Sequence, residues 1–223
     1  MSHLESRPLG RRAGSPATGA GVVGAAGGAS LNPAAGVHAR SSFSCEARCF
    51  CPCGDVVWLA DRSGLVVIRC ARTGSLMDTL QVTSGSTGAA TFGSCMIQTG
   101  NTELWMGTTD GRIIIFNTVT KDQIAELRNL EAEKSGEVTG FALEGHMLFA
   151  SYTSGRVVRW NTITKEMLGT LGVHNAAVQA ITVYGGLCYA GAASGTVSAF
   201  DVKTNERLAQ FTEEPNPVTA LLV

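Results

Sequence analysis

Four cysteines near the start of the apolar part of the chain have the chemistry of a metal site. Cys45, Cys49, Cys51 and Cys53 lie within nine residues, and four thiolates satisfy tetrahedral Zn²⁺. The usual two-residue knuckle spacing and a second distant pair are both missing. The last three cysteines instead alternate at the period of one strand face, so we interpret them as small buried hydrophobes. We therefore expect no metal site.

A glycine motif and recurring serines are the other candidates for chemistry. Gly19, Gly21 and Gly24 spell G-x-G-x-x-G, which seats a pyrophosphate only between a strand and a helix, and neither is predicted here. Nucleophilic catalysis requires an activated Ser or Cys with a histidine base. The serines that stand before glycines recur in several similar segments, and turn geometry explains them. We predict no catalytic residues and no cofactor.

The composition indicates a folded, nearly neutral protein. The 223 residues are 44% hydrophobic and 16% charged, with a net charge of −1, so no global charge favours nucleic acid or an anionic membrane. No apolar run approaches the roughly 18 residues of a transmembrane helix. Seven cysteines, an odd number, and the lack of a signal peptide favour reduced thiols and an intracellular, most simply cytoplasmic, location.

The first forty residues differ from the rest in composition. Residues 1–40 are mostly Gly, Ala, Ser, Pro and Arg and show no helical or strand period, so we predict a disordered tail. Their arginines and single acid also fit an organellar transit peptide, although the glycines oppose its amphipathic helix. Farther along, Glu131, Glu133 and Glu137 with Lys134 form an acidic stretch. We interpret it as a solvated loop between repeats, with a partner contact as the alternative.

Four segments after the tail align without gaps. With Gly64, Gly111, Gly155 and Gly195 as reference positions, the spacings are 47, 44 and 40 residues, the length of one four-stranded propeller blade. The repeat units lie at about 43–81, 91–128, 138–171 and 178–212, with a partial unit at 218–223.

The aligned columns predict the strands and turns of each unit. Six residues before the glycine the side chain is aromatic, and four residues before it the side chain is small. These residues are Trp58, Trp105, Phe149 and Tyr189, and Ala60, Gly107, Ser151 and Gly191. A polar residue then precedes each glycine and a β-branched residue follows, which indicates a hairpin with Gly at positive φ. A shared threonine and two apolar positions mark a second turn and an outer strand, and Val138–Leu143 and Val178–Val183 supply an inner strand. The fold class is all-β, a β-propeller of four-stranded antiparallel blades.

These features resemble those of the WD-repeat family over about residues 43 to 223. Asp110–Gly111 matches the turn dipeptide of that family, and three pairs match its Trp-Asp position with substitutions, namely Trp160–Asn161, Phe116–Asn117 and Phe200–Asp201. His174 falls where the family has its histidine, which implies a structural residue of the blade or, as the alternative, a residue on a binding face. No unit keeps the whole hydrogen-bonding set of the family, so the blades are divergent.

The resemblance implies a non-catalytic scaffold that docks protein or peptide partners on its loops. If the family geometry holds, the glycine turns and the loops before the inner strands share one face. Candidate contact residues there are Arg62, Thr109, Asp110, Thr153, His174 and Asn175. One alternative is the regulatory propeller of a larger enzyme, such as an inositol-polyphosphate 5-phosphatase-like protein, and another is a small enzyme that uses the propeller channel.

The alignment also predicts how many blades this sequence encodes. Val218–Val223 aligns with the inner strands at Val138 and Val178 at a constant step of 40 residues. We therefore expect about four blades plus the first strand of a fifth, an incomplete propeller. The alternative is a four-bladed ring in which the last strand pairs with the first unit.

Overall fold

The computed structural model describes residues 46–82, 91–128, 136–212 and 216–222. The chain divides into Met1–His38 and Ala39–Val223. The first unit lies outside the described residues, as do the predicted tail, Cys45, and Glu131, Glu133 and Lys134 of the acidic stretch, so everything below concerns the second unit.

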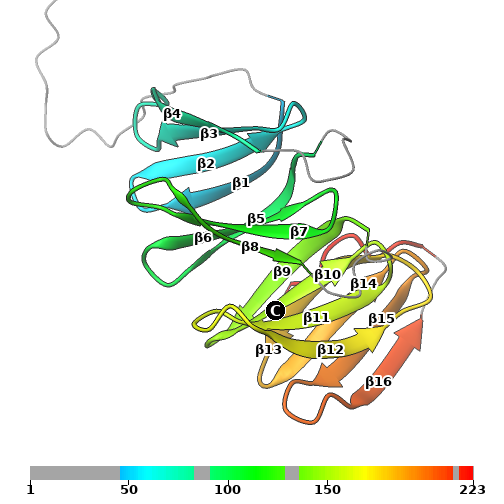
Figure 1. Ribbon diagram of the computed structural model, residues 1–223. Helices are drawn as coiled ribbons and strands as arrows, with labels where there is room; N and C mark the ends of the chain where they lie inside the picture. Colours follow the sequence, from blue (N-terminus) through cyan, green and yellow to red (C-terminus); the bar gives the residue numbers. More distant parts are fainter. Residues whose placement is uncertain (1–45, 83–90, 129–135, 213–215, 223) are drawn as a thin grey trace, which may run out of the picture. The chain divides into compact units, whose positions relative to one another are not determined.

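The described residues form sixteen strands in four antiparallel sheets of four, and each sheet follows the chain order from inner to outer strand (Figure 1). The first sheet comprises β1 (Ala47–Cys53), β2 (Val56–Asp61), β3 (Leu65–Cys70) and β4 (Leu76–Gln81), and the second β5 (Gly93–Thr99), β6 (Glu103–Thr108), β7 (Arg112–Asn117) and β8 (Gln123–Arg128). The third comprises β9 (Val138–Glu144), β10 (Met147–Tyr152), β11 (Arg156–Asn161) and β12 (Met167–Val173), and the fourth β13 (Val178–Tyr184), β14 (Leu187–Ala192), β15 (Thr196–Asp201) and β16 (Arg207–Thr212). The propeller blades predicted from the repeats are confirmed.

The reference glycine of each unit makes the turn between the second and third strands. Gly64, Gly111, Gly155 and Gly195 have φ between 82° and 86°, a region that residues with a Cβ rarely occupy. The following turn repeats as well. The side-chain oxygen of Asn117, of Asn161 and of Asp201 accepts two backbone N–H bonds of 2.7–3.1 Å from the next residues. The Trp-Asp position of the repeat therefore closes the turn into the outer strand.

Successive blades meet at the small residue four positions before the glycine. A Cβ added to Gly107 would lie 2.6 Å from Val138, the first residue of the next inner strand, and a Cβ on Gly191 would meet Val218. In the first blade the small residue is Ala60, and Gly93 of the second blade lies against it. Only small side chains leave room for the following blade. Val218 thus occupies the position that the alignment predicts, although residues 216–222 form no strand.

Hydroxyl groups reinforce these joints between blades. Ser94 Oγ donates to the Val138 carbonyl at 2.5 Å, and Thr139 Oγ1 donates to the Val178 carbonyl at 2.6 Å. Both hydroxyls belong to the second residue of an inner strand, and both acceptors belong to the first residue of the next inner strand. Each bond therefore sets the register of one blade against its neighbour.

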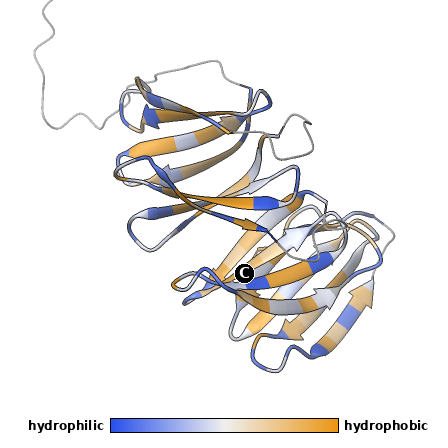
Figure 2. Ribbon diagram, viewed as in Figure 1, coloured by the Kyte–Doolittle hydropathy of each residue, from blue (hydrophilic) through white to orange (hydrophobic). Residues whose placement is uncertain are grey.

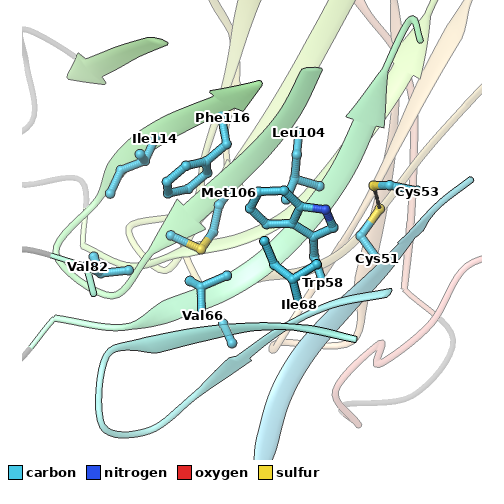
Figure 3. Packing of buried hydrophobic residues seen from close by; sticks show 11 residues of the cluster. Cys51, Cys53, Trp58, Val66, Ile68, Val82, Leu104, Met106, Ile114 and Phe116 are labelled. Carbon is cyan, nitrogen blue, oxygen red and sulfur yellow. Dashed lines mark hydrogen bonds between the residues drawn. The ribbon is translucent and has the colours of Figure 1, made fainter. Parts of the chain in front are cut away.

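The hydrophobic core lies between neighbouring blades. Leu104, Met106 and Phe116 of the second blade pack with Trp58 of the first (Figure 3), and the rings of Trp58 and Phe116 are 5.6 Å apart. Trp105, which alternates with Leu104 and Met106, faces the third blade instead. Hydrophobic residues accordingly follow the strands, whereas hydrophilic residues are concentrated at the turns (Figure 2). Strands covered on both faces read as continuous apolar runs, as β7 does.

The three cysteines interpreted as strand residues do lie on β1. Cys51 and Cys53 are buried and Cys49 is half-buried, whereas Phe50 and Pro52 between them are exposed. All three thiols face the core between the first and second blades. Among the described residues, no helix is long and apolar enough to span a membrane.

Candidate binding site on the glycine-turn face

In the second, third and fourth blades, a backbone hydrogen bond joins the glycine turn to the loop that enters the same blade. The N–H of Thr109 donates to Phe92 O at 3.1 Å, that of Thr153 to Glu137 O at 2.9 Å and that of Ala193 to Ala177 O at 2.8 Å. We call the surface formed by the glycine turns and the described parts of these entering loops the glycine-turn face. Because the bonds repeat from blade to blade, the turns are held in fixed positions on the sheets.

The glycine-turn face carries a polar cavity of about 380 Å³ at the fourth blade. Its lining comes from the loop before β13, from the β14–β15 hairpin and from the outer strand β16. The lining residues are His174, Asn175, Ser194, Thr196, Arg207 and Gln210. All six side chains carry hydrogen-bonding groups. The cavity is therefore suited to a polar or charged group rather than to an apolar ligand.

His174 forms the wall of this cavity and is only 9% exposed. Its ring packs edge-on against Phe200 with the ring centres 5.9 Å apart, and Nε2 is buried without a hydrogen-bond partner. Burial lowers the pKa of His174, and the positive charge of Arg207 lowers it further. The imidazole is thus neutral at pH 7, with one buried ring nitrogen that a bound group is able to satisfy.

Arg207 supplies the positive charge of the cavity. The residue is exposed, and its guanidinium forms no hydrogen bond or ion pair with any of the described residues. A guanidinium presents five donors in a fork that matches a carboxylate. The cavity therefore combines an available cation with neutral donors from Asn175 and Gln210, which favours an anionic or carbonyl-bearing group.

A second cavity of about 420 Å³ lies at the other ends of the strands, between the turns of the second and third blades. It contains Lys165, whose ammonium group pairs with Glu103 and lies 5.2 Å from the centre of the Trp105 ring. Its cation is therefore already satisfied within the chain, in contrast to Arg207.

The six residues predicted as contacts all lie on the glycine-turn face, spread over the four blades. Arg62, Thr153 and Asn175 are exposed, Thr109 is half-buried, and only His174 and Asn175 are brought together in one cavity. Asn175 is therefore the predicted residue best placed to reach a partner.

Asp110 is committed to its own blade. Its carboxylate accepts bonds from Thr108 Oγ1 at 2.6 Å, Arg112 Nε at 2.8 Å and Thr91 Oγ1 at 3.2 Å. Burial raises the pKa of Asp110, but the bonds from Thr108 and Arg112 outweigh it and hold the pKa below its usual value. These contacts tie the entering loop to the turn, so Asp110 stabilises the glycine-turn face.

The sequence reasoning missed Arg207, Ser194, Thr196 and Gln210 as cavity residues. A signal existed for Arg207, because the equivalent residues of the other three units are Leu76, Gln123 and Met167. An arginine that departs from its repeat column is a candidate for function rather than for blade structure.

The cysteines of β1 were also considered as metal ligands. No group of three or more potential metal ligands occurs within the described ranges.

Comparison with solved structures supports a WD40-like propeller fold. A chain of the mitotic checkpoint complex matches with a TM-score of 0.63 at 19% identity, over 74% of this chain and 48% of that chain. The structure of U3-55K gives a TM-score of 0.67 at 16% identity over 80% and 55%, and the RRP9 WD40 repeats give 0.66 at 16% over 80% and 54%. The chain spans about half the length of these solved chains. No curated protein matches the sequence.

A family model described as "Outer membrane protein assembly factor BamB" matches residues 29–170. This model also describes propeller repeats, so it agrees with the four sheets, while the solved structures support a WD40-like propeller. Since the match covers more than half of the sequence, the chain belongs to the propeller family described as outer membrane protein assembly factor BamB.

Proposed function

We propose that this chain is a non-catalytic scaffold that docks protein or peptide partners on its glycine-turn face. The observation that carries the proposal is the polar cavity of the fourth blade, which is lined by Arg207 and His174. Among the described residues, neither the Arg207 guanidinium nor the buried Nε2 of His174 has a hydrogen-bond partner. A rigid sheet that presents adaptable loops is a common way to build a binding surface. The WD40 repeat structures that share the fold are consistent with this role.

The lining of the cavity supports a partner with an acidic side chain. Arg207 provides charge, and Asn175 and Gln210 provide neutral donors, while none of the described residues places a large apolar side chain in the cavity lining. A carboxylate that enters is able to accept from the guanidinium and from His174. The gain is a charge-assisted hydrogen bond in a partly buried site, which is stronger than an exposed ion pair. We therefore propose an acidic segment of a partner protein as the occupant.

Affinity capture with a charge-reversed variant tests this function. The full chain, Arg207→Glu and Lys203→Glu are used as baits in native extract, and bound proteins are quantified by mass spectrometry. Lys203 is a matched control, because it is an exposed cation of the same blade, in the turn before β16, and it does not line the cavity. We expect partners that are retained by the wild type and by Lys203→Glu but lost with Arg207→Glu.

A captured partner is then titrated against each purified variant by calorimetry. A loss of about tenfold or more in affinity for Arg207→Glu, with unchanged thermal midpoints, is the expected result for one charge-assisted contact. Equal binding by Arg207→Glu and the wild type would refute docking at the cavity. Bare resin serves as the background control. If all three baits capture only the proteins that bare resin also retains, the scaffold function is refuted.

A further inference from the structure

Two cysteine thiols are in contact at the joint between the first and second blades. Cys51 and Cys53 are separated by one residue on β1 and are 8% and 6% exposed. Their sulfur atoms point toward each other (Figure 3), and the Cys53 thiol donates to Cys51 Sγ across 3.9 Å. Burial as small apolar side chains explains why cysteines are tolerated here, but it does not require that the two thiols face each other.

Pro52 lies between the two cysteines on β1, within the regular pairing to β2. In an antiparallel strand, residues two apart have Cα atoms about 6.8 Å apart, at the upper limit for a disulfide. A disulfide between Cys51 and Cys53 would therefore draw the strand together. Pro52 is tolerated because β1 is an inner edge strand paired only with β2.

The hydrogen bond also shifts the pKa values of the two thiols in opposite directions. Donation from Cys53 lowers the pKa of Cys51, and the same bond together with burial raises the pKa of Cys53. Cys49 on the same strand face has no such donor, and burial raises its pKa to about 12. Because the thiolate is the reactive form, the lowered pKa makes Cys51 the thiol of the pair that ionises more readily, and Cys53 Sγ lies in contact with it.

We propose that Cys51 and Cys53 form an oxidisable dithiol that a small hydroperoxide converts into a disulfide. The Cys51 thiolate attacks the terminal peroxide oxygen, the O–O bond breaks, and the leaving alkoxide or hydroxide takes a proton from water. Cys51 is then a sulfenic acid. The Cys53 sulfur attacks Cys51 Sγ, the S–O bond breaks, and hydroxide leaves with the Cys53 proton as water. The two sulfurs together give two electrons to the peroxide.

Closure changes the joint between two blades. Cys51 and Cys53 pack in the core that includes Trp58, Leu104 and Met106, so a shorter sulfur separation moves side chains on both sides of the joint. A disulfide that draws the strand together is strained, and strained disulfides are more easily reduced. The site is therefore suited to reversible oxidation.

Peptide mapping after mild oxidation tests the proposal on the full chain. Trypsin cleaves after Arg48 and Arg62, so the three β1 cysteines fall in a single peptide. The reduced protein is exposed to hydrogen peroxide, denatured, alkylated with N-ethylmaleimide and digested without reduction. We expect the peptide to lose two hydrogen atoms and to carry one label, at Cys49. Dithiothreitol before alkylation should restore three labels.

Three variants separate pairing from general thiol oxidation. Cys49→Ser is the matched control from the same strand face and should still form the disulfide. Cys51→Ser and Cys53→Ser should not. In Cys51→Ser, burial still disfavours the Cys53 thiolate, so Cys53 should remain available to label at least about tenfold longer than in the wild type. Thermal unfolding confirms that each variant is folded, and Cys51→Ala and Cys53→Ala replace any serine variant that is not. Oxidation of Cys49 as fast as Cys51, or disulfides only between separate molecules, would overturn the proposal.

Discussion

Alanine substitutions at two glycines with positive φ distinguish the cost of backbone strain from the cost of a steric clash at the glycine turn. Gly155 and Gly145 both have positive φ, at 84° and 59°, so alanine adds left-handed backbone strain of about 1–2 kcal/mol at each. Alanine also lowers the conformational entropy of the unfolded chain, which stabilises the folded state by about 0.4–1 kcal/mol. Nothing lies within 4 Å of a Cβ at Gly145, whereas a Cβ at Gly155 would collide with His174 O and lie 2.8 Å from Ala176 O.

The collision at Gly155 involves backbone and is relieved only if the entering loop moves. Movement breaks the bond of 2.8 Å from His174 N to Gly155 O, which costs about 0.5–1.5 kcal/mol, and overpacking adds about 1–3 kcal/mol. We expect Gly145→Ala to destabilise by about 0.5–1 kcal/mol and Gly155→Ala by about 2–5 kcal/mol. At about 2–4 °C per kcal/mol for a domain of this size, the second change lowers Tm by roughly 4–20 °C.

Equilibrium unfolding in urea, followed by tryptophan fluorescence, measures both variants under the same conditions. Near-equal losses of stability, within about 0.5 kcal/mol, would refute the claim that the glycine turn is packed against the entering loop. A larger loss for Gly145→Ala than for Gly155→Ala would refute it as well.

Three further substitutions test the core and the repeated turns. Trp160→Ala removes a side chain that is 3% exposed and should lower the free energy of unfolding by about 3–5 kcal/mol in thermal or urea unfolding. Ile163→Ala is the control, because Ile163 is 65% exposed and its loss should have little effect. An unchanged midpoint for Trp160→Ala would contradict the packing. Asn161→Ala loses two accepted N–H bonds and should cost about 1–2 kcal/mol, while Asn161→Asp, which copies Asp201 of the next unit, should be nearly neutral. The pKa of Asp110 is lowered in the folded state, so its contribution is present above the unfolded pKa and is lost as the pH falls through the folded value. The stability difference between the wild type and Asp110→Asn should therefore shrink from pH 7 to pH 3, and a constant difference would show that the carboxylate does not contribute through its charge.

The repeat columns predicted the parts of the fold that depend on local chemistry. Gly111 and Gly155 were recognisable because a tight turn at positive φ requires glycine, and Asn161 because a side-chain oxygen closes the next turn. The repeat columns contain no comparable signal for the inner strand β5. Its hydroxyl Ser94 and the matching Thr139 bond to the next blade, and such contacts between blades leave no periodic signal within one repeat.

Only those residues of the candidate site that occupy a fixed position in the repeat could be predicted from the sequence. His174 and Asn175 were placed on the correct face because the entering loop has a fixed position in each unit. Arg207 is paired with Phe200 in the β15–β16 hairpin, and the ring of Phe200 packs against His174 of the entering loop. This contact between distant parts of the sequence leaves no signal in the repeat columns. The contact between Cys51 and Cys53 depends on side-chain rotamers. An alternating pattern indicates a shared face, but not that two side chains on that face touch.

The joint at Gly107 and Gly191 determines how the blades respond to mechanical force. Each glycine packs against the first residue of the following unit, Val138 or Val218. Pulling a blade away therefore breaks this contact and exposes the glycine of the blade before it. Arrays with nearest-neighbour contacts lose one unit at a time. A load applied along the chain should therefore release the blades in discrete events. With spacings of 40 to 47 residues between reference glycines, each event should lengthen the extended chain by roughly 130–170 Å.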